Sequence, residues 1–236
     1  MSVLLRKVPS KIEVYNDINN DVVNFFKILR ERTDELIASL ELTPYSRLEF
    51  AISQQTSEDE LERARRFFIW SWQGRGRAGV KEPGGWRFMS RNTRGRTPVD
   101  DWNNINHLFS IAERLKMIQI EHDDAFKVIK RFDGPDTLFY IDPPYLAHTR
   151  SNRWGTSAYK YEMDNEQHRE LAELLNSAKG KVIVSGYPSE LYNELYKGWE
   201  QVDKSGQVDR GKRGGRERIE RLWMRMEVGY DEGSGQ

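Results

Sequence analysis

The sequence has no cysteine among its 236 residues. This absence excludes a disulfide framework, a thiolate zinc site, an iron–sulfur cluster and a cysteine nucleophile. The four histidines show no metal-ligand spacing, so no metal is expected either. Apolar runs fall far short of the roughly 20 residues that cross a bilayer, and the first residues lack a signal-peptide pattern. We therefore expect a soluble, cytoplasmic protein.

The chain also lacks a net charge, since 37 Lys and Arg residues balance 37 Asp and Glu residues. The total predicts no polyanionic partner, so a nucleic-acid surface would need a local segregation of charge. Residues 73–96 show such a segregation, with seven basic side chains and one acidic side chain, Glu82. A second basic cluster, interleaved with glycine, lies at 210–218. The neutral chain thus has two local candidates for a nucleic-acid surface.

Hydrophobic periodicity predicts alternating strands and helices on both sides of a loop-rich segment at 73–104. Apolar residues at three- and four-residue steps favour a helix over 22–42, with room for a break near Thr33. A Ser-x-x-Glu capping box at Ser57 predicts the start of a helix over 57–68. The other expected elements are strands at 11–16, 117–121, 137–141 and 181–185, and helices at 105–115, 125–131, 165–178 and 189–196.

This alternation indicates an α/β fold with a mostly parallel, doubly wound sheet, whose ligands bind at the carboxyl ends of the strands. The apolar run at 138–141 is typical of a strand buried on both faces of such a sheet. The length suits one substantial core with an inserted, helical and loop-rich subdomain. The expected parts are an amino-terminal core part at 1–45, the inserted subdomain at 46–104, the rest of the core at 105–228 and a disordered tail at 229–236.

The strongest functional signal is the motif Asp142-Pro143-Pro144-Tyr145, which directly follows the predicted strand. Two acceptors aimed at the N–H bonds of an exocyclic amine would stabilise the positive charge that develops on its nitrogen during methylation. The Asp142 carboxylate and the Pro143 carbonyl can be these acceptors, because consecutive prolines keep the backbone stiff. Tyr145 offers a ring face for stacking on a base. The alternative is an ordinary Pro-Pro turn that closes a strand.

Four segments of the chain, 13–19, 119–125, 139–145 and 181–187, resemble the Dam-type DNA adenine-N6 methyltransferases. The resemblance implies a Rossmann-like methyltransferase sheet with S-adenosylmethionine as the methyl donor. It also implies that the target adenine is flipped out of duplex DNA and that the inserted subdomain recognises the DNA. By this resemblance the catalytic residues are Asp142, Pro143, Pro144 and Tyr145, and Asp142 also lies beside the cofactor.

The resemblance further implies that two carboxylates bind the adenosine half of S-adenosylmethionine. Asp17, with Ile18 beside it, would hold the ribose hydroxyls, and a carboxylate at a strand end is the usual partner of a ribose diol. Asp124 would meet the amino group of the cofactor's adenine, with the backbone of Ala125 nearby. Helix capping is the alternative role for Asp17 and for Asp124.

One part of the family's pattern is missing from these 236 residues. The family carries, before the segment that matches 13–19, a Phe-x-Gly-x-Gly loop whose backbone cradles the methionine end of S-adenosylmethionine. We therefore expect either a truncated product or a partner or further segment that supplies this loop. Residues 74–79 fit Gly-x-Gly-x-x-Gly letter for letter, but no helix pattern follows them, so we expect no dinucleotide loop there.

Basic side chains are expected to bind the duplex, because arginine and lysine neutralise phosphates and read base edges in the major groove. A loop just past the catalytic motif, at 148–162, could close over the flipped base. A solvated loop is the alternative for both basic segments. The expected DNA contacts are Arg75, Arg77, Arg87, Arg91, Arg94, Arg96, Arg150, Arg153, Lys212 and Arg213.

The sequence therefore predicts a site-specific DNA adenine-N6 methyltransferase, such as a restriction–modification, phage or orphan enzyme. Two alternatives stay open. One is a truncated, weakly active or inactive remnant that binds DNA or a partner. The other is an N-methyltransferase that acts on RNA or on a protein amide, since the same acceptor geometry would serve both.

Overall fold

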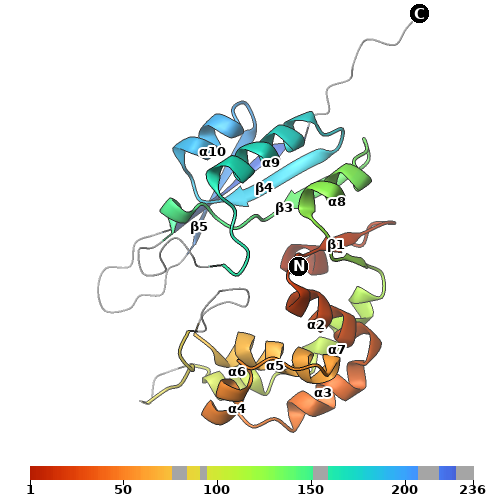
Figure 1. Ribbon diagram of the computed structural model, residues 1–236, viewed down its shortest axis with the longest axis vertical. Helices are drawn as coiled ribbons and strands as arrows, with labels where there is room; N and C mark the ends of the chain where they lie inside the picture. The colour runs from red at the N-terminus through yellow and green to blue at the C-terminus, as the bar shows by residue number, and fades with distance from the viewer. Residues whose placement is uncertain (76–83, 91–94, 151–158, 207–217, 227–236) are drawn as a thin grey trace, which may run out of the picture. The chain divides into compact units, whose positions relative to one another are not determined.

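The chain forms two compact units, Met1–Ala125 and Phe126–Gln236, each with its own sheet. Helices and strands occur in both units (Figure 1), which confirms the predicted α/β class. No helix in the described ranges is long and apolar enough to cross a bilayer. The computed structural model describes residues 1–75, 84–90, 95–150, 159–206 and 218–226.

The first unit combines a small parallel sheet with seven helices in the described residues. Strand β1 (Val14–Asn16) pairs with β2 (Gln119–Glu121). Because these strands are far apart in the sequence, most of the helices form one long excursion between them. The helices are α1 (Ser2–Arg6), α2 (Asn20–Glu31), α3 (Thr33–Glu41), α4 (Arg47–Ile52), α5 (Glu60–Gln73), α6 (Pro98–Trp102) and α7 (His107–Leu115).

A single apolar core holds these helices together. Leu40 of α3, Ile69 of α5 and Leu115 of α7 are fully buried in it. Trp102 of α6 is also buried there, although the sequence predicted only loop at its position. Each buried side chain of this size contributes about 1.5–3 kcal/mol to stability. The segment at 46–104 thus shares its core with residues on both sides, and its boundaries as a separate subdomain stay a prediction.

The sequence located most helices of this unit but not every cap. The expected break near Thr33 is confirmed, because α2 ends and α3 begins on either side of Arg32. The prediction of a capping box at Ser57 is wrong. Asp59 is the N-cap of α5, and its carboxylate accepts a hydrogen bond from the N–H of Leu61 at 2.9 Å. Aspartate caps a helix as well as serine does, so the Ser-x-x-Glu spacing alone does not decide the start.

The second unit has a four-stranded sheet in the order β3-β4-β6-β5. Strand β3 (Leu138–Ile141) runs parallel to β4 (Lys181–Gly186). Strand β6 (Arg218–Arg225) runs antiparallel to β4 and to β5 (Glu200–Gly206), and neither β5 nor β6 was predicted. The other elements are α8 (Ala125–Phe132), the 3-10 helix η1 (Ala147–Thr149), α9 (Asn165–Ser177) and α10 (Glu190–Leu195).

Helix α9 covers this sheet and packs across β4 (Figure 1). Leu175 of α9 is fully buried against the same core as Val182 and Val184 of β4. Trp223 of β6 is also fully buried, with the ring of Tyr192 from α10 at 5.1 Å between centroids. These contacts hold the carboxyl end of β4 in place. Because Ile141 pairs with Val184, they also hold the end of β3.

Strand β3 lies at one end of the described sheet. Leu138 is 51% exposed and Tyr140 is 39% exposed, whereas Phe139 between them is buried. The prediction of a strand buried on both faces is therefore wrong for the described residues. The apolar composition was read correctly, but the face that carries Leu138 and Tyr140 is exposed, and only the face with Phe139 is buried.

Candidate active site

The motif Asp142-Pro143-Pro144-Tyr145 forms the turn that leaves the carboxyl end of β3. Pro143 is buried and anchors the turn, whereas Asp142 is exposed. The two prolines restrict φ and donate no N–H, so the turn is stiff and its carbonyls do not enter a helix. An exposed carboxylate thus stands at a strand end, which is where open α/β sheets bind their ligands.

The Asp142 carboxylate is held by a hydroxyl from the neighbouring strand. Ser185 of β4 lies with its Oγ 2.8 Å from Asp142 Oδ1 and 3.2 Å from the carbonyl oxygen of Ile141. Ser185 is only 6% exposed. In the described part of the chain, the second carboxylate oxygen, Oδ2, has no hydrogen-bond partner. One oxygen of Asp142 is therefore fixed, and the other is available to a substrate.

Tyr145 closes the turn and contacts a second aromatic ring. Its centroid lies 4.6 Å from that of Tyr187, and the rings meet edge to face at 79°. Burial, and then the negative charge of Asp142, raise the pKa of the Tyr145 hydroxyl well above its ordinary value. Tyr145 is therefore neutral at physiological pH, so its side chain can offer a ring surface but not a phenolate base.

Arg150 holds the end of the turn that follows the two prolines. Its Nε donates a hydrogen bond to the carbonyl of Tyr145 at 2.6 Å. Its two terminal nitrogens bind the carboxylate of Glu162 at 2.8 and 2.5 Å, and the side chain is only 7% exposed. All three guanidinium nitrogens are thus engaged inside the second unit. A DNA contact by Arg150 stays a prediction, but this geometry favours a role in holding the turn.

His168 of α9 is fully buried beside the turn. The hydroxyl of Tyr192 lies 3.1 Å from its Nδ1. Burial, and then the positive charge of Arg150, lower the pKa of His168, and the interactions with Asp164 and with the backbone of Pro144 oppose them. The net effect keeps the imidazole neutral at physiological pH. A Tyr192 hydroxyl that donates to Nδ1 leaves the ring proton on Nε2.

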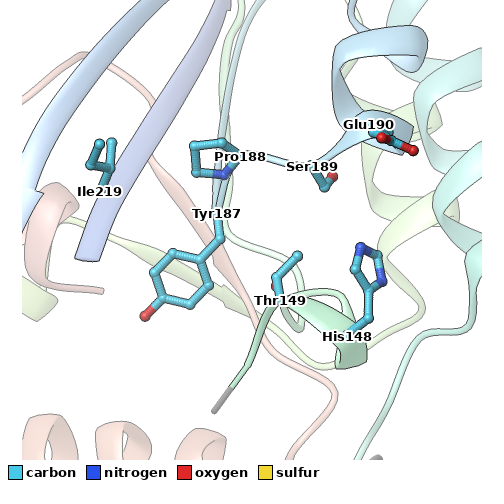
Figure 2. Close-up of a pocket in the computed structure, with 7 residues that line it drawn as sticks. All are labelled: His148, Thr149, Tyr187, Pro188, Ser189, Glu190 and Ile219. Atoms are coloured by element: carbon cyan, nitrogen blue, oxygen red, sulfur yellow. The ribbon is translucent and has the colours of Figure 1, made fainter. Parts of the chain in front are cut away.

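A pocket of about 530 Å³ opens next to this turn, within the second unit. Figure 2 shows that its walls come from η1, from the segment after β4, from α10 and from β6. Tyr187 lines the pocket and also contacts Tyr145, but Asp142 does not line it. The pocket is therefore adjacent to the proposed chemistry rather than its centre. The described residues contain no cluster of His, Asp or Glu that could hold a metal ion.

In the first unit, the loops that follow β1 and β2 lie side by side. The side-chain amide of Asn16 donates to the carbonyl of Asp123 at 3.0 Å and accepts from its N–H at 3.1 Å. A ring nitrogen of His122 lies 3.2 Å from the carbonyl oxygen of Ile18. These contacts bring together the loops that carry Asp17 and Asp124, as the parallel pairing of the strands requires.

The side chains on these loops suit an adenosine group. Asp17 accepts from the N–H of Asn19 at 2.9 Å and from the hydroxyl of Tyr15 at 2.7 Å, which fixes its carboxylate and leaves further lone pairs for a diol. Asp17 does not cap the following helix, because Asn19 is the N-cap of α2. Ile18 is 46% exposed, and Asp124 is exposed on the adjacent loop. The Asp17 carboxylate is suited to ribose hydroxyls, the Asp124 carboxylate to a purine amino group, and the apolar Ile18 side chain to a purine face.

Comparison of the sequence with known protein families identifies the family of this chain. Residues 2–209 match the D12 class N6 adenine-specific DNA methyltransferases. The chain belongs to this family. It is also 24% identical over 216 residues to the Type II methyltransferase M.MjaIII of Methanocaldococcus jannaschii, and the alignment covers 83% of this chain and 73% of that protein. The chain is therefore a DNA adenine methyltransferase that depends on S-adenosylmethionine, as its sequence predicted.

Four of the predicted DNA contacts of this D12 methyltransferase lie in described segments. Arg150 is engaged at the turn, and Arg87 binds Asp101 at 2.7 Å. The side chain of Arg96 is 64% exposed and lies 3.3 Å from the same Asp101. Arg75 is exposed and its guanidinium lies 5.2 Å from the ring centroid of Phe88. The remaining predicted contacts lie outside the described residues: Arg77, Arg91, Arg94, Arg153, Lys212 and Arg213.

Sequence reasoning missed three residues of the D12 methyltransferase that the structure places at these sites. Ser185 binds Asp142 in the turn after β3, His168 is buried beside that turn, and Arg47 lies over the rings of Trp86 and Phe88 at 4.7 and 5.3 Å. Ser185 carried a weak signal, because it is a polar residue within a run of buried apolar strand residues. His168 and Arg47 carried none, since their roles depend on elements that are distant in the sequence.

Proposed function

We propose that this D12 methyltransferase acts on N6 of an adenine flipped out of duplex DNA at a specific sequence. Its catalytic residues in this proposal are Asp142, Pro143, Pro144 and Tyr145. The observation that carries the proposal is the Asp142 carboxylate at the end of β3. One of its oxygens is held by Ser185, and the other faces no protein donor in the described residues. Such a carboxylate can accept a hydrogen bond from a substrate N–H.

The amino nitrogen of adenine is a poor nucleophile, because its lone pair is delocalised into the ring. The Asp142 carboxylate and the Pro143 carbonyl would each accept a hydrogen bond from one N–H of this amino group. Both would stabilise the positive charge that develops on the nitrogen. When bound, S-adenosylmethionine would supply the methyl group, which its positively charged sulfur makes electrophilic, and the departing sulfur would keep the electron pair of the broken bond. One proton then leaves N6 to the solvent, and Tyr145 stacks on the base.

The residues that we propose to bind S-adenosylmethionine lie mainly on the loops after β1 and β2. Asp17 would hold the ribose hydroxyls, and Ile18 would pack on the adenine ring. Asp124 and the backbone of Ala125 would contact the adenine edge. The hydrogen bonds between Asn16 and Asp123 support this assignment, because they hold the two loops together without any ligand. Asp142 would border the methyl group from the catalytic side.

A further segment is part of this proposal. We propose that a glycine-rich loop, in the same polypeptide or in a partner, holds the methionine end of the cofactor. The open edge of β3 supports the idea that this segment brings a strand. Only β4 pairs with β3 in the described residues, so the backbone N–H and C=O groups along the other edge of β3 can pair with a further strand.

We also propose that the basic side chains of the first unit bind the duplex. Arg75 and Arg96 are exposed, and guanidinium groups bind phosphates and guanine edges. Arg47 lies on the same aromatic residue, Phe88, as Arg75 does. This shared ring gives the cluster a defined surface, so we place Arg47 among the proposed contacts. Arg87 would join it, and the basic residues outside the described segments would extend it.

The test is methylation of DNA in a bacterial host that has no adenine methylation of its own. Expression of the chain together with the segment that supplies the glycine-rich loop should produce N6-methyladenine in the host DNA, detected by mass spectrometry of its nucleosides. Asp142→Asn should lower the signal about 10²-fold or more, whereas Asp136→Asn, at an exposed aspartate just before β3, should leave it unchanged. Methylation of cytosine in place of adenine, or undiminished methylation by Asp142→Asn, would contradict the proposal.

A further inference from the structure

Ser185 is an unusual residue for its position in the second unit. It directly follows the apolar residues 182–184 of β4. Its side chain is nonetheless buried, at 6% exposure, and Val182 and Val184 are fully buried. A buried hydroxyl costs free energy unless it is hydrogen-bonded. Ser185 caps no helix in the described residues. Its place in the strand therefore needs another explanation, which its hydrogen bonds supply.

The strand register brings this hydroxyl to the catalytic turn. Ile141 lies opposite Val184 in the β3–β4 ladder, so Ser185 follows the last registered pair as Asp142 does. Its Oγ lies 2.8 Å from Asp142 Oδ1 and 3.2 Å from the Ile141 carbonyl oxygen. A hydroxyl has a single proton to donate, and the closer, charged carboxylate is the stronger acceptor.

This hydrogen bond fixes a side chain that would otherwise rotate. Asp142 is exposed, and an exposed aspartate samples several rotamers. With Oδ1 held by Ser185, the carboxylate has one orientation, and Oδ2 is directed away from the strand hydroxyl. A catalytic acceptor must be held within fractions of an ångström of its productive position.

We infer that Ser185 is a positioning residue for Asp142, which orients the free oxygen of that carboxylate toward the amino group of the substrate. This inference rests on the proposed catalytic role of Asp142. Ser185 itself touches neither substrate nor cofactor. Its contribution should therefore appear in the rate of methyl transfer and not in the affinity for DNA or for S-adenosylmethionine.

The experiment compares three substitutions of Ser185 under single-turnover conditions with labelled S-adenosylmethionine. Ser185→Ala should lower the methyl-transfer rate about 10- to 100-fold, the worth of one charge-assisted hydrogen bond. Ser185→Thr keeps the hydroxyl and should retain the rate within a few fold. Ser185→Cys keeps the volume with a weak donor and should resemble Ser185→Ala. The control Ser177→Ala removes a hydroxyl that binds the Leu174 carbonyl of its own helix at 3.0 Å, and it should change nothing.

Two readouts separate positioning from a merely structural role. The dissociation constants for DNA and for S-adenosylmethionine should stay within about threefold in Ser185→Ala, and its melting temperature should show that it is folded. In the Asp142→Asn background, Ser185→Ala should lower the residual rate by less than twofold, because the group that it positions is already impaired. The same loss in both backgrounds would overturn the inference.

The outcome also distinguishes this inference from the proposed function. Full activity of Ser185→Ala together with a strongly impaired Asp142→Asn would refute the positioning role and leave the catalytic role of Asp142 intact. Full activity of Asp142→Asn would refute the proposed function itself. A loss in Ser185→Ala that Ser185→Thr does not restore would show that side-chain volume, rather than the hydroxyl, is required.

Discussion

Substitution of Arg150 tests whether the turn that carries the proposed catalytic residues depends on the hydrogen bonds of this side chain. Arg150→Ala removes the bond from Nε to the Tyr145 carbonyl and both bonds to Glu162. Hydrogen bonds to charged groups contribute about 1.5–3 kcal/mol each, and they are not additive. Because the Glu162 side chain is 27% exposed, water compensates part of the loss. We expect the free energy of unfolding to fall by roughly 2–4 kcal/mol.

Arg150→Ala should also slow methyl transfer in the variant that still folds. A displacement of the Tyr145 backbone by about 1 Å can lower the rate roughly 10²-fold, so Arg150→Ala should lose at least tenfold in single-turnover rate while still folded. The salt dependence of DNA binding should stay unchanged, whereas removal of a phosphate-binding side chain would reduce its log–log slope by about 0.9. Arg169→Ala breaks an exposed pair with Glu194 and should change neither rate nor stability measurably. A reduced slope with an unchanged rate would refute the role of Arg150 in holding the turn and restore it as a DNA contact.

Two further predictions concern pH and DNA. The lowered pKa of His168 means that the unfolded chain takes up a proton that the folded chain refuses, so stability should fall as the pH decreases below the ordinary value of 6.5. Urea unfolding between about pH 5.5 and 7 should show this slope, which His168→Gln should flatten, and an equal slope in the variant would assign it to other groups. Replacement of Arg91, Arg94 and Arg96 by Ala should weaken DNA binding and reduce its salt slope by about 0.9 for each phosphate that the variant no longer neutralises. An unchanged slope in titrations at several salt concentrations would place the DNA surface elsewhere.

The sequence was informative where the relevant signal is local. Strand β3 and the turn after it were predicted because an apolar run ends directly in Asp142 and two prolines. The break near Thr33 and the helices α8 and α9 were likewise found from periodicity alone. Cap identity was less certain, because Asp59 and Ser57 are both good caps and lie two residues apart.

The missed features depend on contacts between distant segments. The support of Asp142 by Ser185 follows from the β3–β4 register, which no short sequence window contains. Strands β5 and β6 stabilise each other by antiparallel pairing, and their many charged residues hide the strand pattern. Arg150 was predicted to contact DNA because it lies in the loop just past the Asp142 motif, and that contact stays a prediction. Its ion pair with Glu162 was not predicted, because the two residues are 12 positions apart in the sequence. Composition alone could not reveal that pairing.

The most direct test of the central claim is the single-turnover rate of methyl transfer to adenine in duplex DNA by the Asp142→Ala variant, measured in a form of the enzyme that turns over. The account predicts a loss of about 10²- to 10³-fold, with DNA affinity unchanged within a few fold, because the carboxylate acts on the charge that develops on N6 and not on docking of the duplex. A variant that keeps more than half of the parent rate would contradict the role assigned to Asp142.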